Sequence, residues 1–461
     1  MRGTSCIKLA FLLAIVVLPL AFAPGARAQE PLTLSGAVQL ALHQNPALRS
    51  SEDEADAARA RVGEARAEWF PRIDFSQGFT RGDDPVYVFG TLLTQRRFTA
   101  ANFALSNLNT PPPLDNFKTR FDGQMSLFDS GRTRFVVQGA KRLKTAADFE
   151  TEQARQDLIL RVVEDYYDVA VNREDLRAAQ EAVRAAESNE QRVEKMQEAG
   201  LIVDSDLLSA RVFFASMKDR AIRAQNSLEV SQMVLARELG LGPDARPEPS
   251  ETLTEPAAPS RTPQEWTQTA LEHRPALRAA HLQESATTSE KQAAKAEFGP
   301  KVGLYADFER DALTLGGPSG TNWTAGARLE LNLFAGGAQR SRLAEAQAYE
   351  SRAKHNLEWF QSGVLLEVRQ SYLEASAAAQ RAATARDAAD QAREALRIIQ
   401  NRYETGLTDI TELLRAETAQ LDARTGYLSA LHDCQVARAQ LERSAGVLTT
   451  DSEILQGTRA Q

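Results

Sequence analysis

Cysteine is almost absent from this 461-residue chain, which holds only Cys6 near its start and Cys434 near its end. Loss of an N-terminal leader would leave Cys434 alone, so the processed chain cannot form an intramolecular disulfide. Aromatic residues are also scarce, at 7%. The remaining composition, rich in alanine and charged residues, suits long helices better than globular cores.

An excess of basic residues is lacking too. The chain has 54 Lys and Arg against 62 Asp and Glu, a net charge of −8, which argues against nucleic acid as a partner. Beyond the N-terminal segment there is no run of about 20 apolar residues, so we expect no transmembrane helix in the mature chain.

The N-terminal segment, 1–28, has the features of a secretory signal peptide. Arg2 and Lys8 give a basic start, Leu9–Ala23 is apolar, and Ala26–Ala28 ends the segment with a small-x-small cleavage pattern. A single-span anchor is the alternative. The prediction is an exported chain that begins at Gln29, with no cysteine placed for lipid attachment.

Residues that would carry enzyme chemistry are missing from the sequence. None of the five histidines has the spacing of a metal site, and no serine-centred nucleophile elbow occurs. The Gly-rich segment Leu315–Gly320 joins two predicted strands and is interpreted as a hairpin loop. We therefore predict no enzyme activity, no catalytic residue, no cofactor and no metal.

The mature chain is an internal tandem repeat. His43–Phe79 resembles Glu272–Phe308, and Ser126–Arg134 resembles Asn332–Arg340. The first repeat is the longer one between these two matches, and its additional residues lie in an Asn-, Thr- and Pro-rich loop within 83–117. The predicted organisation is a signal peptide at 1–28, a first repeat at 29–245, a Pro-rich linker at 246–261, a second repeat at 262–448 and a tail at 449–461.

Each repeat contains a long helix, a break and a second helix, with apolar positions spaced alternately three and four apart. This spacing predicts antiparallel coiled-coil hairpins. Gly200 and Gly406 are expected to end the long helices in the left-handed conformation. Ser205-Asp206 and Thr411-Glu412 are predicted to cap the helices that follow. The predicted seam is formed by Leu176, Ala179, Val183, Ala186, Glu190, Val193, Gln197, Leu207, Ala210, Phe214 and Met217, and by the equivalent positions of the second repeat, with Cys434 as a small core residue.

Four stretches near 73–80, 120–127, 301–309 and 323–333 alternate between apolar and polar residues, as strands do. In a soluble protein the apolar face covers a core, whereas in a membrane barrel it contacts lipid. On the membrane interpretation Leu329, Leu331 and Leu333 are lipid-facing strand residues. Four strands cannot close a barrel, so three chains would be needed for twelve strands. Aromatic residues predicted at the strand ends are Trp69, Phe70, Phe128, Phe298 and Phe334.

Several of these motifs together resemble the TolC-like outer-membrane efflux proteins. They are Leu32–Arg49, the repeat, "SLFDSGR" and "LNLFAGG", and the two tip sequences. The resemblance implies an α+β membrane protein: a homotrimer with a 12-stranded β-barrel in the outer membrane and a long antiparallel coiled-coil α-helical barrel across the periplasm. It also implies docking to a periplasmic adaptor and, through it, an inner-membrane pump of the RND or ABC type.

The resemblance assigns roles to the two tips. Gly200-Leu201 and Gly406-Leu407 match the turns on which the adaptor docks. Asp206 and Tyr403 match two residues that close the tunnel in TolC, and Glu412 matches an acid that narrows it. Thr408 stands where TolC has an arginine and Arg415 where it has a second acid, which changes the closing contacts and charge expected here.

Two functions follow from these patterns. The first is a passive outer-membrane duct of a tripartite efflux or type I secretion system. The second is a soluble periplasmic coiled-coil scaffold or adaptor, in which Leu329, Leu331 and Leu333 would be covered by protein instead of lipid. The exported substrate is left open.

Overall fold

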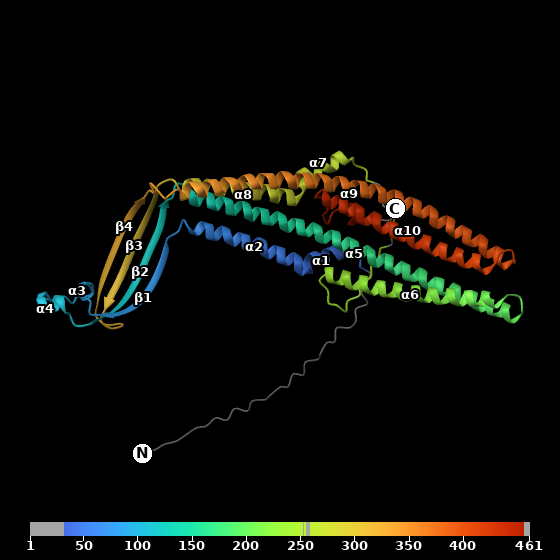
Figure 1. Cartoon of the computed structure of the whole chain (residues 1–461), viewed down its shortest axis with the longest axis horizontal. Coiled ribbons are helices and arrows are strands. Elements are labelled where there is room, and N and C mark those ends of the chain that lie inside the picture. Colours follow the sequence, from blue (N-terminus) through green and yellow to red (C-terminus); the bar gives the residue numbers. More distant parts are fainter. Residues whose placement is uncertain (1–31, 252, 255–258, 456–461) are drawn as a thin grey trace, which may run out of the picture.

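The computed structural model describes residues 32–251, 253, 254 and 259–455. The predicted signal peptide and the mature N-terminus at Gln29 lie outside the described residues, as do parts of the predicted linker and tail. Within the described residues the chain is strongly elongated (Figure 1), with a β-sheet at one end and two helical hairpins at the other.

The helices of the two repeats match one another in length and position. Helices α1 (Leu34–Gln44) and α2 (Pro46–Ala67) correspond to α7 (Pro263–His273) and α8 (Pro275–Ala296). The long helices α5 (Arg132–Glu198) and α9 (Ala338–Glu404) each have 67 residues. Helices α6 (Asp204–Glu238) and α10 (Ile410–Ser444) each have 35. The predicted repeat is therefore confirmed.

The predicted seams of the two hairpins are also confirmed. In the first hairpin Ala179, Ala186, Val193, Ala210 and Met217 are buried at the expected three- and four-residue spacing. In the second, the buried residues include Ala382, Ala389, Leu413, Ala416 and Cys434. Many of these positions are alanine, which lets the helix backbones approach closely.

The sheet consists of four antiparallel strands in the order β1-β2-β3-β4 (Figure 1). They are β1 (Arg72–Gly82), β2 (Leu114–Phe128), β3 (Lys301–Ala312) and β4 (Ser319–Glu330). Because β2 pairs with β3, the sheet joins the two repeats into one unit. Strands β1 and β4 are its outer edges.

The prediction that Leu331 and Leu333 belong to the fourth strand is wrong, because β4 ends at Glu330. Glu330 pairs with Lys301, the first residue of β3. Beyond this pair, β4 has no neighbour within the sheet on either side. Leu329 lies in the strand, and the two later leucines lie in the connection to α9.

The insertion in the first repeat is not the irregular loop that its composition suggested. It contains α3 (Pro85–Thr94), the 3₁₀ turn η1 (Ala100–Phe103) and α4 (Leu105–Asn109). Asp84 caps α3 by accepting from the Tyr87 amide, and Pro85 occupies the first helical position, where it costs no hydrogen bond.

This insertion covers the end of the sheet remote from the long helices. The buried Gln95 side chain donates to the Asp115 carbonyl and to Asn116, and Asn116 donates to the buried Asp311 of β3. A Cβ at Gly320 would lie 1.8 Å from the Thr94 carbonyl oxygen, so only glycine allows this approach.

No helix among residues 32–251, 253, 254 and 259–455 is both long enough and apolar enough to cross a membrane.

Candidate functional site: two helical tips and a two-faced sheet

The two predicted tip glycines end their helices as expected. Gly200 and Gly406 have φ of 73° and 72°. At each turn the glycine N–H bonds three residues back and the following leucine N–H five residues back, the Schellman arrangement. The leucines, Leu201 and Leu407, are 71% and 69% exposed. The two tips thus present equivalent apolar side chains at the end remote from the sheet.

The predicted caps after the tip turns are wrong. Helix α6 begins at Asp204, and its N-cap residue, Val203, makes no side-chain capping bond. Helix α10 is capped by Asp409, whose carboxylate accepts from the Glu412 amide at 2.9 Å. Each observed cap lies two or three residues before its predicted pair, because the helices already begin at Asp204 and Ile410.

The two tips are packed against one another inside the chain. Val193, Leu207, Ala210 and Ile410 form a buried cluster, with Ile202, Tyr403 and Leu414 partly buried against it. The structure therefore brings Tyr403 of the second tip against residues of the first.

The Tyr403 phenol lies in a partly buried environment beside charged residues of the first repeat. Burial raises the pKa of the Tyr403 phenol, the Asp206 charge raises it further, and Arg192 opposes the increase. Arg192 also lies 3.7 Å from Glu404, so this pair links α5 to α9 beside the tips. Sequence reasoning missed Arg192, because a charged residue beside a seam looks like any solvated helical position.

Glu412 is not an isolated acid in this structure. Its carboxylate lies 2.9 Å from the Arg415 guanidinium on the same exposed helix face. Exposed pairs of this kind contribute little to stability, but Arg415 lowers the negative charge that Glu412 presents. Within the described part of the chain, no hydrogen bond or ion pair joins Glu412 to Asp206 or Tyr403.

The sheet has one apolar and one charged face, and both are accessible in the single chain. Strand register places Phe75, Phe121, Phe308 and Trp323 in one row across all four strands. All four are exposed, at 62%, 44%, 43% and 76%. Leu329 lies on this face and is 69% exposed. A core does not cover this face, as the scaffold interpretation would require.

Charged and polar residues fill the opposite face. Asp74, Asp122 and Asp307 lie opposite one another in adjacent strands. Arg72 and Arg120 offset the repulsion, at 3.0 Å from Asp74 and 2.6 Å from Asp122. The predicted aromatic residues at the strand ends are all exposed as well, from 40% to 86%: Trp69, Phe70, Phe128, Phe298 and Phe334.

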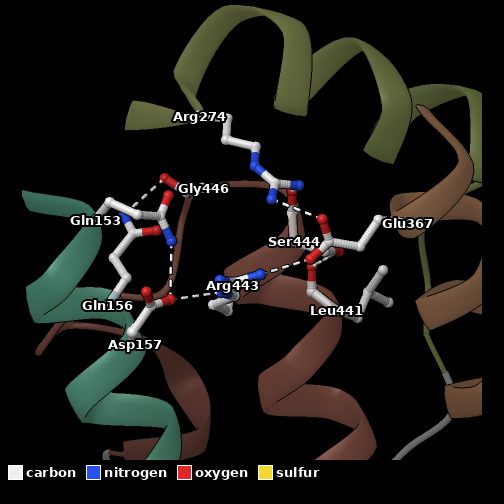
Figure 2. A network of polar contacts seen from close by, with 9 residues as sticks. All are labelled: Gln153, Gln156, Asp157, Arg274, Glu367, Leu441, Arg443, Ser444 and Gly446. Carbon is white, nitrogen blue, oxygen red and sulfur yellow. Dashed lines mark hydrogen bonds and ion pairs between the residues drawn. The ribbon is translucent and has the colours of Figure 1, made fainter. Parts of the chain in front are cut away.

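A polar network ties the two repeats together midway along the helices (Figure 2). Arg274, only 5% exposed, donates to the Glu367 carboxylate at 2.6 Å and to the Ser444 carbonyl. Arg443 joins Glu367 of the second repeat to Asp157 of the first, at 2.5 and 2.7 Å. The network was missed from the sequence because its members are far apart in the chain; Arg443 and Asp157, for example, are separated by 286 residues.

The described part of the Pro-rich linker also lies against this middle region. The chain at Leu32 forms a short parallel bridge with Pro249, and Tyr166 of α5 donates to the Leu32 carbonyl at 2.8 Å. Arg173 donates to the Pro249 carbonyl. These contacts hold the linker alongside the helices instead of leaving it extended into solvent.

The chain is similar in sequence and in fold to several known proteins. The chain is 27% identical over 443 residues to Protein CyaE of Bordetella pertussis, covering 92% of this chain and 86% of that one. It is 24% identical to alkaline protease secretion protein AprF of Pseudomonas aeruginosa, covering 90% and 85%. The solved CmeC outer membrane channel of Campylobacter jejuni superposes with a TM-score of 0.76 at 19% identity, over 92% and 88% of the two chains.

The fold and its two-faced sheet define a channel protein of the bacterial outer membrane, in which long helices extend from a β-sheet. The model of the outer membrane efflux protein family matches residues 37–241 and 266–447. The chain belongs to this family. It is an outer-membrane channel of efflux or type I secretion systems, and the periplasmic scaffold alternative is not supported.

Proposed function

We propose that the chain works as a homotrimer that forms a continuous exit duct for substrates delivered by an inner-membrane pump of the RND or ABC type through a periplasmic adaptor. The observation that carries the proposal is the sheet, with an uncovered apolar face, a charged face and two unpaired edges. Unpaired strand edges cannot remain open in lipid. Three copies joined edge to edge would supply twelve strands and close a barrel.

In such a barrel the exposed row of aromatic residues contacts lipid, and the charged face lines a water-filled lumen. The free edge of β4 would then meet β1 of the partner subunit. That pairing would also give Leu331 and Leu333 the neighbouring strand that they lack in one chain. Leu329, Leu331 and Leu333 are proposed to contact the outer-membrane lipid.

The tips are proposed to dock the adaptor. Leu201 and Leu407 are exposed apolar side chains at two equivalent turns, so two adaptor contacts per chain are expected. Asp206, Tyr403 and Glu412 are proposed to gate the tunnel beside them. Support comes from the packing of Tyr403 of the second tip against Val193, Leu207 and Ala210 of the first.

The first experiment is the native mass of the processed protein after extraction of the outer-membrane fraction in mild detergent. We expect three chains per particle. A monomer, or a particle confined to the periplasmic fraction, would contradict the trimeric duct.

Docking is tested with the double variant Leu201→Asp and Leu407→Asp, which we expect to abolish export while trimers still form. Leu315→Asp is the matched control, because Leu315 is also 71% exposed but lies in the hairpin at the opposite end of the chain. Export unchanged in the double variant would remove the tips from docking.

The gate is tested by Glu412→Gln, which we expect to weaken the block of single-channel current by divalent cations. Glu394→Gln provides a control on an exposed acid that is likewise paired with an arginine three residues away. Equal cation block in Glu412→Gln and in the unmodified channel would remove Glu412 from the tunnel lining.

A further inference from the structure

The insertion of the first repeat packs on the charged face of the sheet. In strand register Asn116, Asp311 and Gly320 belong to that face, because they alternate with the row of aromatic residues on the other side. Gln95 donates to Asn116 at 3.0 Å, and Asn116 donates to Asp311 at 2.6 Å. The carbonyl oxygen that approaches Gly320 belongs to Thr94. Helix α3 therefore lies against β2, β3 and β4 on the side that faces the lumen of the proposed barrel.

Tyr87 holds the start of α3 on the same face. Its hydroxyl donates to the Thr80 carbonyl of β1 at 3.0 Å. A Cβ at Gly82 would lie 3.3 Å from the Tyr87 ring, which places the ring over the charged face at the end of β1. The helix is thus fixed at both ends, by Tyr87 over β1 and by Gln95 over β2 and β3.

Helix α3 is apolar on both of its sides. Val88 and Thr91 lie on one side and are buried, at 5% and 6% exposure. Val86, Phe89 and Leu93 lie on the opposite side at three- and four-residue spacing and are 81%, 37% and 49% exposed. The helix contains no charged residue. Because a helix that is apolar all round is normally buried, the exposed side is expected to be enclosed in the assembled protein.

The contacts within the insertion fix the position of this exposed side. The ring centres of Phe89 and Phe98 are 4.9 Å apart, and those of Phe98 and Phe103 are 5.1 Å apart, both edge to face. Arg96 donates to the Thr321 carbonyl at 2.8 Å and ties the segment after α3 to β4. The apolar side of α3 is therefore preformed in the single chain.

The symmetry of the proposed trimer decides what encloses the apolar side. Helix α3 lies on the lumen side of the sheet, so lipid cannot reach it, and threefold symmetry brings three copies into one lumen. A helix with its side chains is about 10 Å across, whereas a wide aqueous channel requires about 16–18 strands. Three copies of α3 would therefore occupy much of a lumen of twelve strands. The second repeat adds no such helix, because the short connection 313–318 joins β3 to β4.

We propose that the three insertions form an apolar constriction at the outer mouth of the duct, in which Val86, Phe89 and Leu93 of each copy face the threefold axis. The insertion lies at the end of the sheet remote from the helices (Figure 1), so this barrier is at the opposite end of the duct from the tips. The proposal rests on the trimeric duct proposed above. An apolar constriction holds back water and ions by dewetting, and it also limits the size of what leaves the duct.

The test measures how well reagents outside the cell reach a cysteine below the constriction. Thr324 is exposed on the charged face of β4, four residues beyond Gly320, or about 13 Å along the strand. Intact cells that carry full-length Thr324→Cys in a Cys434→Ala background are treated with maleimides on polyethylene glycol chains of increasing mass. We expect a size limit above which this cysteine is labelled only after the trimer is unfolded. Labelling by all reagents in the folded trimer would overturn the constriction.

The double variant Phe89→Ala and Leu93→Ala removes bulk from the apolar side and leaves the contacts of α3 with the sheet in place. At the size limit of the unmodified channel, we expect the labelling rate of Thr324→Cys to rise by about tenfold. The matched control is Phe75→Ala with Leu329→Ala, which removes exposed apolar bulk from the opposite face of the sheet. The control should leave the rate unchanged. An equal rise in both double variants would indicate a loosened barrel and would overturn the proposal.

A deletion provides a second variant that does not depend on the remaining bulk of α3. Residues 83–113 are replaced by the connection 313–318 of the second repeat, which already joins two antiparallel strands of this sheet. We expect the size limit for labelling of Thr324→Cys to rise further. Trimers of normal mass in which the limit is unchanged would overturn the constriction while leaving the duct intact; absence of trimers in the unmodified protein would overturn both.

Discussion

Neighbouring positions in β4 allow the two faces of the sheet to be tested separately. Ala325 and Thr324 are adjacent in the middle of the strand and point to opposite faces, paired with Ala306 and Asp307 of β3. Both are exposed in the single chain. In a protein surrounded by water, arginine at either position would change stability by roughly 0.5 kcal/mol or less.

In the proposed barrel the two substitutions have different costs. Ala325→Arg places a charge against lipid near the middle of the strand, at about 2–4 kcal/mol per chain. Since three chains assemble together, the cost per trimer is about 6–12 kcal/mol, enough to prevent assembly. Thr324→Arg places the charge in the lumen, which already contains Arg328 on the same face of β4, and should cost about 1 kcal/mol or less.

The assay is the yield of heat-modifiable trimers in the outer-membrane fraction, with both variants expressed at the same level. We expect Thr324→Arg to give normal trimers and Ala325→Arg to give none. Equal trimer yields from the two variants would refute the assignment of the apolar face to lipid, because the two neighbouring positions differ chiefly in the face they occupy.

Three further outcomes are expected. Glu367→Gln removes the negative charge that Arg274 and Arg443 share, so trimer stability should fall by about 2–3 kcal/mol. The control Glu394→Gln breaks an exposed ion pair and should cost about 0.5 kcal/mol or less. Equal melting temperatures for the two variants would contradict a stabilising role for the network. Gly406→Ala should destabilise the second tip by about 1–2 kcal/mol, because its φ is 72° while no atom lies within 4 Å of the new Cβ; unchanged protease sensitivity at the tip would contradict this. Burial and the nearby Glu238 charge raise the pKa of Asp165 to about 7, so this residue lowers stability as pH rises from about 4 to 7. Asp165→Asn should flatten that decline in melting temperature, and an equally steep decline in the variant would contradict the raised pKa.

The sequence alone determined the features that depend on local periodicity. Seam positions follow from the three- and four-residue spacing, strand faces from alternation, and the helix ends from Gly200 and Gly406. The internal repeat strengthens these assignments, because a seam position, strand or helix end proposed in one copy can be checked at the equivalent position of the other. These features were predictable since each depends on residues within a few positions of one another.

Only the tertiary structure decided the features that depend on residues distant in the chain. Nothing near Arg274 or Arg443 in the sequence sets these arginines apart, and only folding brings Glu367 between them. The end of β4 at Glu330 depends on where β3 begins, which no pattern within β4 records. Most importantly, α5 and α9 have matching seams but different packing partners. Helix α5 packs against α8 and α10 of the other repeat, whereas α9 packs against helices of its own repeat. Which of them is covered within the chain and which is left exposed depends on how the two repeats pack, because burial is a property of the packed surfaces and not of either helix alone.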